Sequence, residues 1–109
     1  MLPGASKENR QSALAVAADF GHVEIVRLLL DAGEDPNRYN PVGGHSHATP
    51  LHLAAKAGHD EVVRLLVKRG ARLDFKDILW RATPVDWARH EGKLEIEAYL
   101  RRKIGGAAS

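Results

Sequence analysis

Two histidines, His45 and His47, have the side-chain type and spacing most suggestive of metal chemistry in this 109-residue sequence. Side chains two residues apart on an extended segment leave the same face, and a neutral imidazole is a common zinc ligand. Two ligands do not make a zinc site, and the sequence has no cysteine that could add a thiolate. We therefore expect no metal or other cofactor. A small-ligand or metal-dependent activity at this segment is the alternative function.

No nucleophile, base and acid are arranged for catalysis. Ser46 lies beside the two histidines but has no obvious acid to orient one of them, and Thr49 and Thr83 precede predicted helices. Asp86 follows Thr83 by three residues, where a carboxylate favours a helix N-terminus. The sequence therefore predicts a protein that is not an enzyme.

Two short helices are predicted within residues 49–71, directly after the segment that carries the two histidines. Thr49 can cap the first helix, and Pro50 suits its first position. Gly58 and Gly70 supply the helix ends, because glycine readily adopts positive φ. The apolar residues between these signals have helical spacing: Leu51, Ala54, Ala55, Val62, Leu65 and Leu66.

The same unit starts three times, at residues 12, 49 and 83, so the copies are 37 and 34 residues apart. The segment Thr-Pro-Leu-His-Leu-Ala at residues 49–54 and the Gly-His pairs at residues 21–22 and 58–59 resemble the ankyrin repeat of about 33 residues. The resemblance covers residues 9–104, and more narrowly the sequence looks like bacterial ankyrin repeat proteins.

This resemblance implies an all-α repeat solenoid of three stacked helix-turn-helix repeats joined by hairpin-like fingers, with the last repeat as a C-terminal cap. The expected repeats span residues 9–40, 41–80 and 81–104, after a frayed leader at 1–8 and before a disordered tail at 105–109. The resemblance also implies that His52 lies near the Thr49 cap and that His22 and His59 bond loop carbonyls.

Composition narrows the function classes further. The net charge is only +2, and the basic run at residues 101–103 suits a helix C-terminus better than nucleic acid. No apolar run approaches the ~18 residues of a membrane span. We therefore expect a protein that binds neither nucleic acid nor membrane. We also expect it to be cytoplasmic, since the absence of cysteine gives no sign of an oxidising compartment.

Both fingers exceed the usual ankyrin spacing, by about four residues and about one. The second carries Ile78, Leu79 and Trp80 where polar residues and a turn glycine are usual. Two interpretations stay open. Leu79 and Trp80 pack against Pro41 and Val42 of the first finger, or Tyr39, Phe75 and Trp80 are exposed anchors for a partner.

The family resemblance implies a protein–protein interaction module that binds through its fingers and the concave face of the first helix in each repeat. The matching helix positions are Asp19, Lys56 and His90. The matching finger positions are Arg38, Tyr39, His45, His47, Phe75, Trp80 and Arg81.

Three expectations concern the ends of the stack. Glu97 and Arg101 replace apolar residues of the earlier repeats, so we expect both to be largely exposed on a terminal face. Trp87 should fill the space between the second and third repeats, with its indole N–H near a carbonyl. Val16 and Ile25 should face an absent preceding repeat, which suggests truncation, cover by the leader, or self-association through this face.

Overall fold

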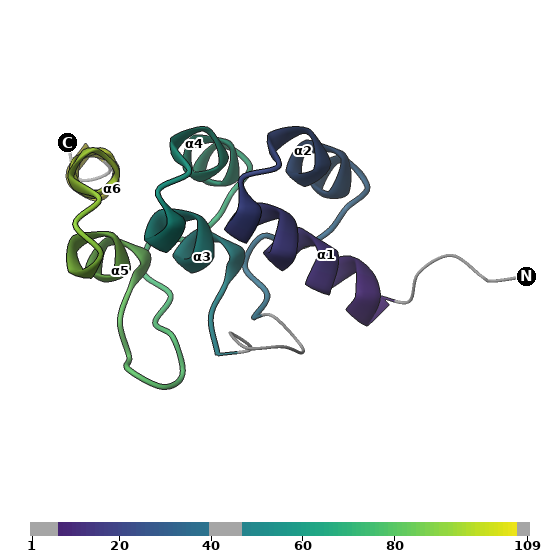
Figure 1. The fold of residues 1–109 in the computed structure, drawn as a ribbon, viewed down its shortest axis with the longest axis horizontal. Helices are drawn as coiled ribbons and strands as arrows, with labels where there is room; N and C mark the ends of the chain where they lie inside the picture. The colour runs from purple at the N-terminus through teal and green to yellow at the C-terminus, as the bar shows by residue number, and fades with distance from the viewer. Residues whose placement is uncertain (1–6, 40–46, 107–109) are drawn as a thin grey trace, which may run out of the picture.

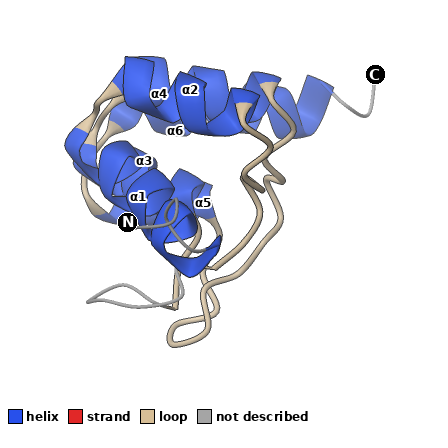
Figure 2. Ribbon diagram, turned by 90° about the vertical axis from the view of Figure 1, so that its right-hand side faces the viewer, coloured by secondary structure: helices blue, strands red, loops and turns tan. Residues whose placement is uncertain are grey.

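The computed structural model of the chain describes residues 7–39 and 47–106. Within these residues it contains helices and loops and no strand (Figure 2). The helices are α1 (Lys7–Phe20), α2 (Val23–Asp31), α3 (Pro50–Ala57), α4 (Asp60–Lys68), α5 (Pro84–His90) and α6 (Leu94–Gly106).

The helices form three antiparallel pairs stacked in one row (Figure 1). The first helices of the pairs, α1, α3 and α5, make one layer, and α2, α4 and α6 make the other. The described parts of the loops between pairs project beyond the first layer (Figures 1 and 2). This arrangement confirms the expected all-α repeat solenoid. We call residues 33–49 the first finger and residues 70–83 the second finger.

Local sequence signals place the helix ends. Thr49 and Thr83 have extended backbones and precede a proline at the first helical position. The Thr83 hydroxyl accepts a hydrogen bond from the Asp86 amide at 3.4 Å. At the other end of α3, Gly58 adopts a left-handed φ of 83°, which a side chain would disfavour.

Two helix bounds differ from the expected leader and tail. Helix α1 begins at Lys7, because residues 7–11 contain no glycine or proline that would disfavour a helix. Helix α6 continues to Gly106 and is 13 residues long, whereas α2 and α4 have 9. Ile104 stands where Gly33 and Gly70 end the earlier helices, so α6 has no glycine stop there.

The core runs continuously through the three pairs. Small residues of α1 and α3 let these helices approach closely, while branched aliphatic residues of the second helices fill the space between layers. The fully covered side chains include Leu14, Ala18, Val26, Leu51, Ala54, Ala55, Val62, Val63, Leu66, Ala88 and Leu100.

The expectation for Glu97 is wrong. Its side chain is only 16% exposed, whereas that of Arg101 is 54% exposed as expected. Arg101 lies one helical turn further along α6 and donates to the Glu97 carboxylate at 2.9 Å from Nη2 and 3.0 Å from Nε. This contact keeps the Glu97 carboxylate against the helix instead of extended into solvent.

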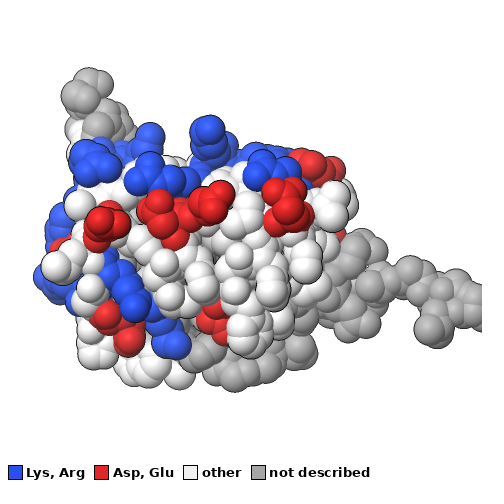
Figure 3. All heavy atoms as spheres, turned by 45° about the horizontal axis from the view of Figure 1, so that its top comes forward, with Lys and Arg blue, Asp and Glu red and all other residues white. Residues whose placement is uncertain are grey.

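Charges of both signs alternate over the outer face formed by α2, α4 and α6 (Figure 3). Several are paired, as in Arg64 with Asp60 at 2.9 Å and Arg69 with Asp31 at 2.7 Å. Such mixed and exposed pairs contribute little to stability. This face is therefore a poor candidate for binding a polyanion.

Candidate protein-binding surface

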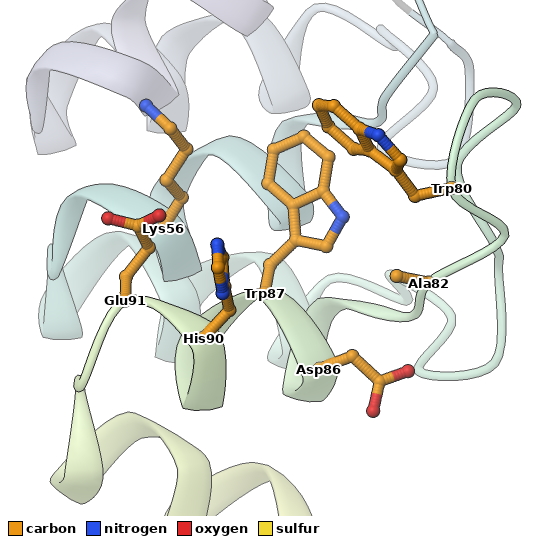
Figure 4. A pocket seen from close by; sticks show the side chains of 7 residues that line it. All are labelled: Lys56, Trp80, Ala82, Asp86, Trp87, His90 and Glu91. Atoms are coloured by element: carbon orange, nitrogen blue, oxygen red, sulfur yellow. The ribbon is translucent and has the colours of Figure 1, made fainter.

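A groove of about 550 Å³ lies between α3, α5 and the second finger. Figure 4 shows Lys56 and Glu91 on one side, Trp80 on the opposite side, and Trp87 and His90 between them. Lys56 and His90 hold equivalent positions on α3 and α5, so the repeat itself aligns them. The lining residues are Lys56, Trp80, Ala82, Asp86, Trp87, His90 and Glu91.

The second finger is folded around the buried carboxylate of Asp77. Oδ2 accepts from the Trp80 amide at 2.7 Å, and Oδ1 accepts from the Ala82 amide at 2.8 Å and from Trp87 Nε1 at 3.2 Å. The Asp77 amide donates back to the Ala82 carbonyl at 2.9 Å, which closes a hairpin-like turn. We call residues 77–82 the Asp77 turn.

The Asp77 carboxylate is ionised despite its burial. Burial alone raises the pKa of this group, but the hydrogen bonds from Trp80, Ala82, Trp87 and His47 outweigh that effect and hold the pKa below its usual value. A charge that is satisfied by several donors fixes the turn in one conformation.

The Asp77 turn presents three large apolar side chains in succession. Ile78, Leu79 and Trp80 are 62%, 63% and 66% exposed. The Trp80 ring also touches His47 and Trp87, with ring centroids 5.0 and 5.8 Å away. The Trp80 ring therefore packs on two other rings and still exposes most of its surface to solvent. Such exposure agrees with the interpretation of Trp80 as an anchor for a partner. Pro41 and Val42, which the packing interpretation needs, lie outside the described residues.

The neighbouring fingers are tied together by hydrogen bonds. Asn37 accepts from the Arg72 amide at 2.7 Å and donates to the Gly70 carbonyl at 3.0 Å. The Tyr39 hydroxyl donates to the Lys76 carbonyl at 2.7 Å. Cross-finger bonds of this kind limit how far each finger can move independently.

Structural histidines join neighbouring repeats through hydrogen bonds to backbone carbonyls. His52 Nδ1 accepts from the Thr49 amide at 3.2 Å, and its Nε2 lies 2.8 Å from the Ala82 carbonyl, to which it donates. His59 Nε2 lies 2.9 Å from the Asp19 carbonyl. The expected position of His52 is confirmed, whereas His59 bonds a carbonyl in the last turn of α1 instead of a loop carbonyl. His22 is exposed.

The structure gathers three of the sequence-predicted site residues, Lys56, Trp80 and His90, in the groove. Tyr39 and Phe75 stack on each other with ring centroids 6.1 Å apart, away from the groove lining. Asp19 at the end of α1 and Arg38 in the first finger are half-buried outside that lining, and Arg81 is exposed with a left-handed φ of 53°.

The two finger histidines do not form a matched pair of surface ligands. His47 is buried, and its Nδ1 lies 3.3 Å from Asp77 Oδ2. His45 lies outside the described residues. Over the described part of the chain, no three histidines or carboxylates are grouped closely enough to hold a metal ion.

Sequence reasoning missed Asp77 and Glu91. Asp77 carries a recognisable signal, because an aspartate that starts a turn often accepts amide hydrogen bonds from residues shortly after it. Glu91 has no such signal, since only the packing of α5 beside α3 brings it to the groove. Trp87 is correctly placed between repeats, although its indole N–H meets a carboxylate instead of a carbonyl.

Three stacked helix pairs, projecting fingers and a groove beside the first helices define a helical repeat protein. A family model described as ankyrin repeats in three copies matches residues 2–77 and 42–106. The chain belongs to the ankyrin repeat family.

Similar proteins with curated names include cyclin-dependent kinase inhibitors. Rat cyclin-dependent kinase 4 inhibitor B is 34% identical over 96% of this chain and 99% of its own length. Human cyclin-dependent kinase inhibitor 2A is 33% identical over 94% of this chain and 84% of its own length. A mouse protein, inactive serine/threonine-protein kinase TEX14, is 41% identical over 76% of this chain and 5% of its own length.

These relatives are mammalian, so they give no support to the expected likeness to bacterial ankyrin proteins. A second finding concerns membranes. None of the helices in the described segments combines the length and apolar character that crossing a bilayer requires.

Proposed function

We propose that this chain is a protein-interaction module that binds a partner protein through the Asp77 turn and the adjoining groove, without catalysis. The observation that carries the proposal is Trp80, two-thirds exposed yet held by its amide to a buried carboxylate. Tryptophan is enriched among residues that dominate binding energy. An anchor that is already ordered loses little entropy on binding.

The groove supplies polar contacts on either side of this anchor. Lys56 and Glu91 place opposite charges on one wall, and His90 adds a ring that can donate or accept. A mixed rim of this kind suits a protein surface, where charged contacts fix orientation around an apolar centre. Arg38, Tyr39, Phe75, Arg81, Asp19 and His45 remain proposed as peripheral contacts. His47 leaves the proposed set, because it is buried beneath Trp80.

Cyclin-dependent kinase 4 is the first partner to test, because the names of the relatives refer to it. We propose a kinase of this class as the partner because the similarity spans nearly the whole chain and nearly the whole relative. A cytoplasmic location is a further proposal and rests on composition alone, since the sequence contains no cysteine.

Titration calorimetry of the purified chain with this kinase tests both the partner and the surface. If Trp80 is the anchor, Trp80→Ala should weaken binding by about 30-fold or more. Leu94→Ala is the matched control, because Leu94 is equally exposed but begins α6, outside the groove lining. Equal affinities for Trp80→Ala and wild type would refute the proposed surface, and no binding by wild type would refute the proposed partner.

His47 is a poor candidate for the alternative function, a ligand or metal site at the His45/His47 segment. His47 already contacts Asp77, and burial leaves its ring little access to solvent.

A further inference from the structure

The second and third repeats show how the side of a helix pair that faces the preceding repeat is covered. Four positions on this side are buried in both repeats: Pro50, Leu53, Val62 and Leu65 in the second, and Pro84, Trp87, Ile96 and Tyr99 in the third. The equivalent residues of the first repeat are all exposed: Ala13, Val16, Ile25 and Leu28.

Contacts with the preceding repeat account for this burial. The Trp87 ring packs on His52 of the second repeat, with centroids 5.1 Å apart. The Arg64 guanidinium of the second repeat lies 4.4 Å from the centre of the Tyr99 ring. Leu53 belongs to a buried cluster with Ala15 of the first repeat. The first repeat therefore presents a stacking surface of the same kind without a helix pair against it in the described residues (Figure 1).

The difference in exposure is large at each position. Val16 is 50% exposed, whereas its equivalent Leu53 is 2% exposed. Ile25 is 47% exposed, whereas Val62 is fully buried. Phe20 follows Val16 by one helical turn and is 65% exposed, so it extends the same apolar surface. We call Ala13, Val16, Phe20, Ile25 and Leu28 the leading face.

The opposite end of the stack is a poor partner for the leading face. There Arg89 stands at the position that Ala18 and Ala55 hold in the earlier repeats, and Arg101 stands at the position of Leu30 and Val67. Stacking copies head to tail would bury these guanidinium groups against apolar side chains, at a large desolvation cost. Head-to-tail filaments are therefore disfavoured.

We propose that two copies of this chain associate through their leading faces about a two-fold axis. Every residue that defines the leading face is uncharged, so a two-fold axis sets no like charges of these residues against each other. Pairing would bury apolar side chains whose equivalents in the later repeats are already buried between repeats. It also limits the assembly to a dimer, since a two-fold interface buries the leading face of both copies.

This association should be weak. Specific interfaces use about 20–30 residues on each partner, whereas the leading face is defined by only five. We therefore expect a dissociation constant on the order of 100 µM. The leading face is on α1 and α2, apart from the groove lining, so the proposal does not depend on the proposed function.

Sedimentation equilibrium over a range from about 10 µM to about 1 mM tests the proposal. The mass of wild type should rise from 11.9 kDa toward twice that value. Val16→Glu combined with Ile25→Glu should remain at 11.9 kDa throughout. Leu79→Glu introduces one such charge at an exposed site on the second finger, away from the leading face, and should associate as wild type does.

Three outcomes would overturn the proposal. Wild type could stay at 11.9 kDa at every concentration, or the Leu79→Glu control could abolish association. Association could also continue beyond a dimer, which would indicate head-to-tail stacking. A variant without residues 1–6 identifies cover by the leader: if it dimerises while wild type does not, the leader occupies the face.

The absence of native cysteine allows a second measurement. Cysteines placed singly at Val16, Ile25 and Leu28 should give at least one rapid disulfide-linked dimer, because a two-fold axis brings one or more of these positions close to its copy. Leu79→Cys should link slowly. Equal rates at all four positions would mean random collision and would contradict the proposed pairing.

Discussion

The imidazole of His52 works only in its neutral form. Its Nδ1 accepts the Thr49 amide, so the single ring proton must be on Nε2, where it faces the Ala82 carbonyl. Burial lowers the pKa of His52, and the bond to Ala82 offsets part of that effect. His52 thus joins the start of α3 to the second finger while remaining uncharged.

Stability should consequently fall as the pH drops below about 6.5, the ordinary histidine value. Below this pH the unfolded chain binds a proton at His52 that the folded chain does not bind. Above this pH His52 makes its full contribution to the free energy of unfolding. One proton bounds the slope at about 1.4 kcal/mol per pH unit. Urea unfolding of wild type and His52→Asn from pH 7.5 to about 5 measures the difference.

His22→Gln serves as the control, since His22 is exposed and makes no side-chain cap. An NMR titration in which His52 takes up its proton at the ordinary histidine pH would contradict the prediction.

At the residue scale, prediction from sequence succeeds where a motif repeats. Thr49, Pro50 and His52 stand in one such motif, so their structural roles could be predicted from their order alone. Lys56 and His90 were placed by counting from it. Asp77 could not be placed this way, because its role depends on the loop conformation around it and on Trp87, ten residues further along the chain.

At the element scale, the second finger is rigid because one carboxylate accepts from several donors. Asp77 is 1% exposed, and Trp80, Ala82 and Trp87 all direct N–H groups at it. The exposed apolar residues therefore lie on a loop whose shape is set from inside. Such a loop keeps its anchor ordered without burying the anchor.

Asp77→Asn should disorder the second finger, although asparagine has nearly the same side-chain shape as aspartate. The asparagine oxygen can replace Oδ1, but its NH₂ group then faces the Trp80 amide, so two donors meet. We expect a loss of about 1–3 kcal/mol in the free energy of unfolding, measured with urea. Asp74→Asn is the matched control, because Asp74 is exposed and its carboxylate pairs with nearby Arg72 at the surface. Equal effects of the two substitutions would show that Asp77 does not organise the finger.

Element lengths were predicted well where glycine marks an end and less well elsewhere. Gly58 and Gly70 are at or just beyond the ends of α3 and α4, as expected. Helix α6 extends into the expected tail because Ile104 replaces that glycine. The fingers resisted prediction, because their shape depends on bonds between loops, such as that from Ile78 to the His47 carbonyl at 2.9 Å.

On the scale of the whole molecule, the stack has unlike ends. The first repeat exposes apolar side chains where later repeats are packed, and the last repeat substitutes Arg89 and Arg101 at stacking positions. The main contacts between helix pairs join neighbours in the row, α1 with α3, α2 with α4 and α3 with α5. The stability of a terminal repeat should therefore depend on the single interface that it makes.

Trp87 provides much of that interface for the third repeat. It is 7% exposed, packs on His52 and donates to Asp77 across the boundary between repeats. Trp87→Ala should cost about 3–5 kcal/mol in the free energy of unfolding. Because stacking couples only neighbouring repeats, amide hydrogen exchange should accelerate more in α5 and α6 than in α1 and α2.

Trp80→Ala provides a control of the same residue type in the same aromatic cluster. Trp80 is largely exposed, so its removal should leave both the unfolding free energy and the exchange pattern close to those of wild type. Exchange by mass spectrometry compares the two variants peptide by peptide. If Trp87→Ala accelerated exchange equally in all six described helices, the three repeats would unfold as one unit, and the nearest-neighbour description of this stack would be wrong.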